Sequence, residues 1–393
     1  MSEAGECIAE HTRLLRLVGF LRAGGGGGAG GVGGAAHAAY RAAVLALTSL
    51  YLAQECLYAY RARSDMAKLS RVMFLLLCHV TSIVKQIVFH VDAARIDKMI
   101  EDLDGAVYNG GGERAQRMRA CTRVRARRVV RVYAGCAVLT CTLWLLFAAL
   151  DRARGRPVEF PFCTGLHAAA DQPLQFTLVL LYSYYVTTLV GIANTTMDAF
   201  IATILYQCQT QFKILRMELE ELPDSAWKFS LKTGLDYDKI LMEMFVERLH
   251  HYKSITEMAS LLQDIFNTAI VVQFGIGGWI LCMAAYKLVS LNVLSIEFAS
   301  MTLFIFCILT ELFLYCYYGT ELTVESERLA SSVYAMRWLG TSARFRRALV
   351  LLMERARRPL RPAAARVVPL SLDTFLKILK SSYTFYAVLR QTK

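Results

Sequence analysis

Residues 129–149 read "VVRVYAGCAVLTCTLWLLFAA", a run in which Arg131 is the only charged residue. A helix needs about 20 mostly apolar residues to cross the hydrocarbon core of a bilayer. The run meets that length, and it has no polar alternation of the kind that a barrel strand would show. Backbone groups cannot remain unpaired in lipid, so the stretch predicts a transmembrane helix.

Six further stretches have a similar character, and the whole chain is 55% hydrophobic and 19% charged. The predicted spans are residues 37–59, 70–90, 129–149, 174–197, 266–289, 298–318 and 367–390. The first and last are the most polar, with Arg41, Glu55, Asp373, Lys377 and Lys380 inside them. The sequence predicts an all-α membrane protein with seven transmembrane helices.

Basic residues predict its orientation, because Lys and Arg accumulate on the cytoplasmic side of membrane proteins. The segments that the predicted spans place on one side of the membrane, among them the loop 91–128, hold 29 Lys and Arg residues. The segments on the other side hold 10. The N-terminus is therefore expected in the cytoplasm and the C-terminus outside. The net charge of +12 is then mainly an orientation signal and not a sign of nucleic-acid binding.

Two segments continue past their spans with a helical pattern, residues 198–265 and 319–366. Apolar residues recur there at three- and four-residue steps, as in Phe200, Ile204, Phe212, Leu215 and Leu219. Exposed apolar stripes would be unfavourable, so these rods are expected to pack on one another or on neighbouring subunits as an intracellular anchor domain.

The remaining organisation follows from these segments. Residues 1–36 form a cytoplasmic N-terminal segment whose glycine-rich part, 24–34, is expected to be a flexible linker. Residues 37–197 hold the first four spans, 266–318 the fifth and sixth, and 367–393 the last helix. The histidines of the pair His250-His251 are expected at the surface, because other metal ligands are not nearby in sequence.

The last third of the chain resembles the insect odorant receptors. The segments that carry the resemblance are "LHHYKSITEMASLLQDIFNTAIVVQFGIGGWILCMAAYKL" (249–288), "YCYYGTELTVESERLASSVYAMRW" (315–338), "RFRRALVLLMERARRPL" (344–360) and "LSLDTFLKILKSSYTFYAVLR" (370–390). A related gustatory-receptor signature is matched at Thr384 and Gln391 and departs at the aromatic positions. Across the chain, the resemblance is weakest in the first hundred residues.

The resemblance implies a ligand-gated, non-selective cation channel of four subunits in the plasma membrane of a sensory-neuron dendrite. Subunits of the shared odorant co-receptor would complete the heterotetramer, and the last helix of each subunit would line the pore. It places an apolar constriction at Val388, with Gln391 and Thr392 just outside it and Thr384 on the pore wall. The mixture of Ser, Thr and Lys with Phe, Tyr and Val in this helix suits a wall that faces water on one side.

The ligand implied is a small apolar volatile, held in a dry cavity in the outer half of the bundle. The candidate residues there are Phe74, Cys78, Thr140, Trp144, Phe147, Tyr182, Tyr185 and Phe304. Thr140, Trp144 and Phe147 lie one helical turn apart and share a face. Tyr182 and Tyr185 are slightly favoured, because a hydroxyl in a dry site needs a partner.

Two charges inside the spans need separate treatment. Lys85 lies near the inner end of its span and is expected to snorkel to the interface. Glu311 lies deeper, and we expect it to face protein or water.

Three alternatives stay open at this point. A gustatory-type receptor channel would share the fold. A metabotropic seven-helix receptor would need an external N-terminus. An enzyme or transporter would show clustered catalytic residues or an internal repeat, and neither pattern is visible, so no enzyme activity, cofactor or metal is expected.

Overall fold

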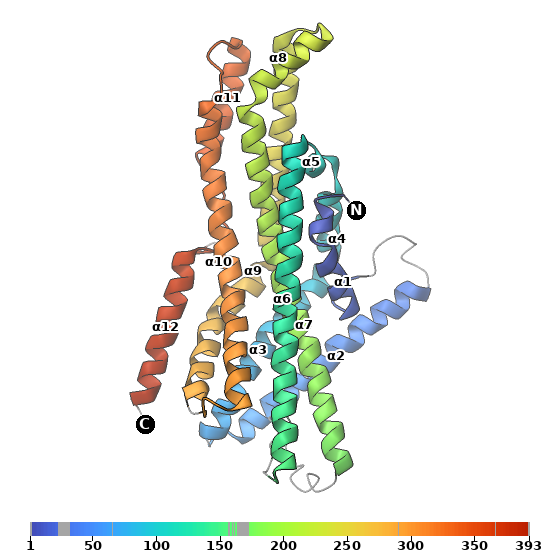
Figure 1. The fold of residues 1–393 in the computed structure, drawn as a ribbon, viewed down its shortest axis with the longest axis vertical. Helices are drawn as coiled ribbons and strands as arrows, with labels where there is room; N and C mark the ends of the chain where they lie inside the picture. The colour runs from blue at the N-terminus through green and yellow to red at the C-terminus, as the bar shows by residue number, and fades with distance from the viewer. Residues whose placement is uncertain are drawn as a thin grey trace.

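In the computed structural model the chain is a long helical bundle (Figure 1). The structure describes residues 2–22, 32–64, 66–155, 158, 160, 162, 173–289, 291–365 and 367–391. The first helices are η1 (Gly5–Cys7), α1 (Ala9–Leu17), α2 (Val32–Arg61), α3 (Met66–Val91), α4 (Ala93–Asp104), α5 (Ala106–Asn109) and α6 (Glu113–Ala153). The later helices are α7 (Pro173–Glu220), α8 (Leu222–Thr233), α9 (Tyr237–Val289), α10 (Ile296–Ala335), α11 (Ala343–Ala356) and α12 (Leu372–Gln391).

One small sheet interrupts the helices. Strands β1 (Ala363–Ala364) and β2 (Val368–Pro369) pair antiparallel, with Ala363 opposite Pro369. This hairpin immediately precedes α12, so the predicted last span, 367–390, begins with a strand and a turn before the helix starts.

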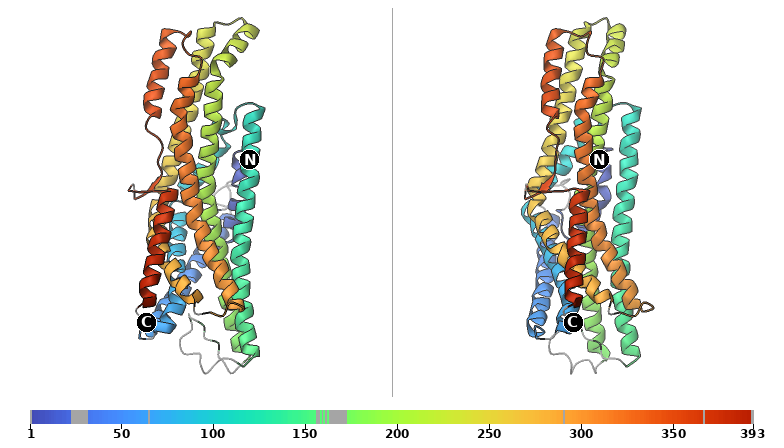
Figure 2. Two further views of the ribbon diagram at one scale, coloured as in Figure 1. Left: turned by 60° about the vertical axis from the view of Figure 1, so that its left-hand side comes forward. Right: turned by 90° about the vertical axis from the view of Figure 1, so that its left-hand side faces the viewer.

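The expected all-α membrane architecture is confirmed. Among the described residues, six helices are long and apolar enough to cross a membrane, namely α2 from Gly34 on, α3 from Val72 on, α6, α7, α9 and α10. The seventh helix, α12, has 20 residues but carries Lys377 and Lys380, and it falls short of that composition. It still runs alongside the apolar half of the bundle, next to α9 and α10 (Figure 2).

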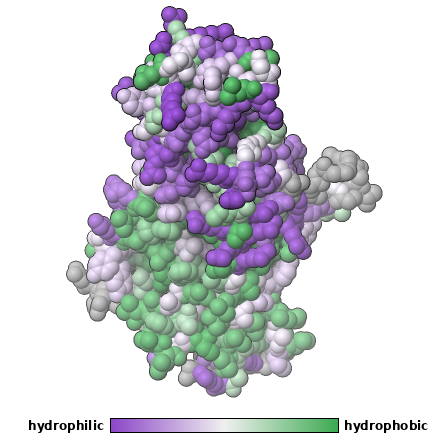
Figure 3. Space-filling model, turned by 45° about the horizontal axis from the view of Figure 1, so that its top comes forward, coloured by the Kyte–Doolittle hydropathy of each residue, from purple (hydrophilic) through white to green (hydrophobic). Residues whose placement is uncertain are grey.

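The predicted rods exist as uninterrupted continuations of α7, α9 and α10, which have 48, 53 and 40 residues. The apolar stripe expected from the sequence is buried, since Phe200, Ile204, Phe212 and Leu215 are 0% exposed. We refer to residues 198–265 and 319–366 as the extension. Figure 3 shows hydrophilic residues over the extension end of the molecule and hydrophobic ones over the other half.

The glycine-rich segment is only partly described. Residues 23–31 lie outside the described residues, and helix α2 begins at Val32. The last three residues of the predicted linker are therefore helical. The prediction that His251 lies at the surface is wrong. Its side chain is buried and hydrogen-bonds to the Gln211 amide oxygen at 3.0 Å. Only His250 of this pair is exposed.

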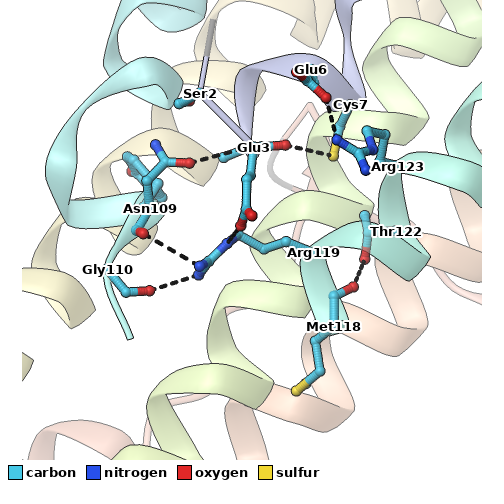
Figure 4. A network of polar contacts seen from close by, with 12 residues as sticks. Ser2, Glu3, Glu6, Cys7, Asn109, Gly110, Met118, Arg119, Thr122 and Arg123 are labelled. Carbon is cyan, nitrogen blue, oxygen red and sulfur yellow. Dashed lines mark hydrogen bonds and ion pairs between the residues drawn. The ribbon is translucent and has the colours of Figure 1, made fainter. Parts of the chain in front are cut away.

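The N-terminal segment, residues 2–22, is folded and docked on the bundle, which its sequence did not reveal. Figure 4 shows its ion pairs with α6. Arg119 Nε lies 3.0 Å from Glu3 Oε2, and the same guanidinium donates to the Gly110 carbonyl at 2.8 Å. A second pair joins Arg123 to Glu6. The basic run of α6 thus serves as a docking surface for acidic N-terminal residues.

Burial completes this docking. Ile8, Leu15 and Phe20 are 0% exposed and belong to the main core. His11 is also fully buried and contacts Thr203 Oγ1 through Nε2 at 3.1 Å. Because burial penalises the charged imidazolium, the pKa of His11 is lowered to about 4.

Candidate functional site

Three aromatic side chains meet in the apolar half of the bundle, at the end away from the extension. Phe74 on α3 lies 6.3 Å from Trp144 on α6 and 5.3 Å from Phe304 on α10, as ring centroids. Trp144 and Phe304 are 5.8 Å apart. We refer to these three residues as the aromatic cluster. All three were predicted as ligand-site residues, and the structure brings them into mutual contact from three helices.

Other predicted residues lie around this cluster. The Cys78 side chain packs against the same hydrophobic core, one turn along α3 from Phe74. Thr140 is buried one turn before Trp144, but its hydroxyl donates to the Cys136 carbonyl at 2.8 Å. Phe147 is half-buried near the end of α6. The predicted shared face of α6 therefore supplies one clear member of the cluster, Trp144.

The two tyrosines on α7 are not part of the aromatic cluster. Tyr182 packs against Tyr51 and Phe162, with centroids 5.9 and 5.8 Å away, and its hydroxyl donates to Gln54 Oε1 at 3.2 Å. Tyr185 is 53% exposed on the outer surface of the bundle. Tyr182 thus belongs to a separate group between α2 and α7, and Tyr185 contributes to neither.

Sequence reasoning missed two neighbours of the aromatic cluster. Lys287 on α9 places its ammonium 5.1 Å from the centre of the Phe74 ring and also pairs with Glu297 at 3.0 Å. Met301 is buried in the same core. A cation next to an aromatic face is attracted by the ring quadrupole, so the cluster has one charged neighbour at its edge.

Deeper in the bundle, polar side chains form a second, chemically opposite group. Lys85 Nζ lies 2.6 Å from Asp198 Oδ1 and 3.1 Å from Asn194 Oδ1, and it also pairs with Glu311. The Tyr315 hydroxyl donates to Asp198 at 2.5 Å. We refer to Lys85, Asp198 and Glu311 as the ionic cluster.

The ionic cluster corrects one prediction. Lys85 does not snorkel, because it is 1% exposed and surrounded by oxygen acceptors from α7 and α10. A charged side chain snorkels when it has no partner inside the protein, whereas Lys85 has two carboxylate partners. Glu311 is buried and faces protein, which is one of the two environments expected for it.

The charges of the first span are also paired inside the protein. Glu55 Oε2 lies 2.6 Å from His79 Nδ1, and both side chains are buried. Arg41 approaches the Phe89 carbonyl at 3.5 Å. A polar first span is therefore compatible with the membrane, because its charged residues have partners on α3.

Three of the predicted pore residues, Thr384, Val388 and Gln391, lie on α12. One side of this helix packs on α9, where Phe385 stacks on Trp279 at 5.0 Å and Ser382 Oγ lies near Gly278. Thr384 is exposed, and Val388 is 53% exposed. Gln391 is the last helical residue, while its side chain and Thr392 lie outside the described residues. In the single chain, Thr384 and Val388 thus face away from the main bundle.

Comparison with known proteins identifies a family. Residues 65–383 match the model of the seven-transmembrane odorant receptors. Putative odorant receptor 92a of Drosophila melanogaster is 25% identical over 202 residues, covering 51% of this chain and 47% of the relative. Odorant receptor Or1 of Anopheles gambiae is 21% identical over 360 residues, which cover 87% of this chain and 85% of the relative. The matches to the first three curated relatives span 47–58% of those proteins.

A solved structure has the same fold. The insect olfactory receptor OR5 from Machilis hrabei superposes with a TM-score of 0.82, at 16% identity and with 98% of both chains covered. The structure of that receptor in complex with eugenol gives a TM-score of 0.79. At this level of identity the likeness establishes the arrangement of the helices.

Proposed function

Because the chain belongs to the insect odorant receptor family, we propose that it is a subunit of a ligand-gated, non-selective cation channel that opens when a small volatile binds among its transmembrane helices. It is a multi-pass protein of the plasma membrane. The dendrite of a sensory neuron is the proposed location. Recognition of the volatile is assigned to the aromatic cluster, and conduction to α12.

The aromatic cluster is the observation that carries this proposal. Phe74, Trp144 and Phe304 come from three different helices, so a ligand that inserts among them would change the spacing of α3, α6 and α10. Apolar and aromatic walls are typical of sites for small volatiles. The related receptor that binds eugenol, an aromatic compound, supports an aromatic or apolar volatile as the ligand here.

Helix α12 is the proposed pore wall. It presents Lys380, Thr384 and Val388 at four-residue steps along one side, which places them on one face of the helix. A ring of Val388 side chains from four subunits would close the pore by dewetting, and a modest outward movement would readmit water. Thr384, Gln391 and Thr392 would line the water-filled parts.

The extension is the proposed assembly domain. Helix α11 exposes apolar side chains there, with Leu351 at 73% and Val350 at 56%. Large apolar side chains exposed together favour contact with another protein surface. We assign this surface to neighbouring subunits, including the odorant co-receptor, in a heterotetramer.

The orientation of the N-terminus separates this proposal from a metabotropic receptor. Residues 2–22 pack on α6 at the hydrophilic end of the molecule, with the basic residues Arg119 and Arg123 as partners. Basic residues favour the cytoplasmic side. This arrangement supports a cytoplasmic N-terminus, the reverse of a G-protein-coupled receptor.

Whole-cell recording tests the proposed function. Cells expressing the chain, with and without the co-receptor, are exposed to a panel of volatiles while G-protein signalling is blocked. We expect a fast cation current that survives the block, and a larger resting leak in Val388→Ala than in the wild type. A current abolished by the block would contradict the channel, and an unchanged leak would exclude Val388 as the constriction.

A further inference from the structure

The extension contains a cavity that the proposed channel function does not use. Its volume is about 420 Å³, within the range of small-molecule sites. It lies between α7, α9, α10 and the segment that follows α11. The cavity is too small for a protein segment of any length, and its size fits a compact metabolite.

Charge is the first indication of what the cavity holds. Arg355 and Arg358 line it. In the described part of the chain, neither guanidinium lies within ion-pair distance of a carboxylate, whereas their neighbours Arg357 and Arg361 pair with Glu354 and Glu327 at 3.4 and 3.3 Å. Among the described residues, Arg344, Arg346 and Arg347 earlier in α11 also have no carboxylate within ion-pair distance, so what distinguishes Arg355 and Arg358 is their position at the cavity.

The opposing acidic group does not cancel this charge. Glu257 also lines the cavity, and Lys253 lies 3.6 Å from its carboxylate on the same helix. With Arg355 and Arg358 on the other side, the net charge around the cavity is positive. An anion is therefore the complementary ligand, and planar guanidinium groups bind phosphate oxygens in a two-pronged geometry.

The remaining walls fit the body of an organic phosphate. Phe212 and Tyr252 form an edge-to-face pair with centroids 6.2 Å apart, which gives the cavity an aromatic wall. Ser260, which makes no hydrogen bond within the described residues, adds a hydroxyl that can reach a ligand. Arginines, a hydroxyl and an aromatic surface together favour a phosphate monoester with a ring-bearing or polyhydroxylated body.

The cavity is fixed in shape by the backbone around it. Ser326 Oγ accepts a hydrogen bond from the Leu360 backbone N–H at 3.0 Å and donates to the Thr323 carbonyl at 2.8 Å. This contact ties the segment after α11 to α10. The backbone that carries Arg355 and Arg358, on either side of the end of α11, is therefore positioned beside the cavity, while both side chains are exposed.

Depth separates a soluble ligand from a lipid headgroup. The β1–β2 hairpin is joined to α9 at Asn267, whose side chain accepts from the Ala365 N–H at 2.7 Å, and the predicted span of α9 begins at residue 266. Tyr252 and Ser260 lie 15 and 7 residues before Asn267 along α9, which at the helical rise places them about 22 and 10 Å further from the membrane. A bilayer headgroup would not reach the far wall at that distance.

We propose that this cavity is a binding site for a small soluble organophosphate, with its phosphate between Arg355 and Arg358 and its body against Phe212 and Tyr252. The site is independent of the volatile site. A cytoplasmic ligand bound there would act on helices α9, α10 and α11 of the extension.

Calorimetric titration of the purified full-length chain in detergent tests the proposal. The probe is inositol 1,4,5-trisphosphate, and a parallel arm uses vesicles that contain phosphatidylinositol 4,5-bisphosphate. The test variant is Arg355→Gln/Arg358→Gln. The control is Arg344→Gln/Arg347→Gln, which removes the same charge from exposed positions of α11 outside the cavity. Unchanged melting temperatures verify that both variants fold.

We expect saturable binding of the soluble probe, weakened about tenfold or more in the test variant and less than about twofold in the control. Equal weakening in both variants would indicate a general effect of surface charge and would overturn the site. Absence of binding to the wild-type chain would also overturn it. Binding to the vesicles alone would replace the soluble ligand with a lipid.

Discussion

The aromatic and ionic clusters occupy the same faces of two helices, yet their chemistry is opposite. Phe74 and Lys85 are 11 residues apart on α3, and Phe304 and Glu311 are seven apart on α10. These separations are close to three and two helical turns, so both clusters lie on one face of each helix. Along each helix, the charged residue of the ionic cluster lies about 10–17 Å from the aromatic residue of the aromatic cluster.

The difference has a mechanical consequence. Aromatic contacts at 5.3–6.3 Å are weakly directional and can be rearranged around a guest at small cost. The ionic cluster makes short, directional bonds, such as Lys85 to Asp198 at 2.6 Å, and any helix shift would break them. One end of the bundle is therefore suited to accommodate a ligand, and the other fixes the register of α3, α7 and α10.

Removal of the lysine is expected to have the largest effect. Lys85→Met would leave Asp198 and Glu311 buried together without a positive partner, a loss of about 3–5 kcal/mol in the free energy of unfolding. The variant should fail to reach the surface or should melt far below the wild type in detergent, as measured by fluorescence-detected size exclusion.

Lys287→Met is the matched control for this substitution. Lys287 pairs with Glu297 and lies over the Phe74 ring at the edge of the bundle, where the side chains are 17% and 23% exposed, so its loss should cost about 1–2 kcal/mol. If the two variants melted at the same temperature, the ionic cluster would not be the fixed point of the bundle.

Acid is expected to weaken the docking of the N-terminal segment. The pKa of His11 is lowered to about 4 in the folded chain, from an ordinary 6.5, because the side chain is buried. Between these values the unfolded state binds a proton that the folded state does not, so stability falls as pH drops from 6.5 towards 4. His11 should contribute a slope of up to about 1.4 kcal/mol per pH unit, and buried His251, whose pKa is also lowered to about 4, should contribute a similar amount.

Melting temperatures across this pH range measure the effect. His11→Gln should reduce the slope by about half, because buried His251 still contributes, and the exposed His250→Gln should leave it as in the wild type. If the pH dependence of stability were as steep in His11→Gln as in the wild type, protonation of His11 would not contribute to it.

The aromatic cluster should tolerate change best. Phe74→Leu keeps the position apolar and replaces the ring with a smaller aliphatic group, which should cost only about 1–1.5 kcal/mol in the free energy of unfolding. The same melting measurement checks this value. A Phe74→Leu variant that melts as low as Lys85→Met would remove the contrast between the two clusters.

The sequence predicted those features that depend on local periodicity. Apolar length predicted the membrane helices, and three- and four-residue steps predicted the buried stripe of α7. The same rule distinguishes the two tyrosines in retrospect. Tyr182 lies on the stripe that continues through Val186 and Val190, whereas Tyr185 is one position off that stripe and faces outward.

Long-range polar pairing could not be predicted. Lys85 is separated from Asp198 by 113 residues and from Glu311 by 226, and spacing within one segment cannot indicate such a partner. The docking of residues 2–22 was missed for the same reason, since Glu3 and Arg119 are 116 residues apart. Whether a buried charge snorkels or pairs depends on neighbours that only the fold brings together.

The concentration dependence of the odour-evoked current tests the central claim most directly. Phe304→Leu alters the aromatic cluster, and Phe306→Leu makes the same change on α10 at a side chain that is 57% exposed. With the strongest agonist of the panel and equal surface expression, we predict a shift in half-maximal concentration of about tenfold, or ~1.4 kcal/mol, for Phe304→Leu. Phe306→Leu should be unchanged. Equal responses from the two variants would contradict the assignment of the ligand site to the aromatic cluster.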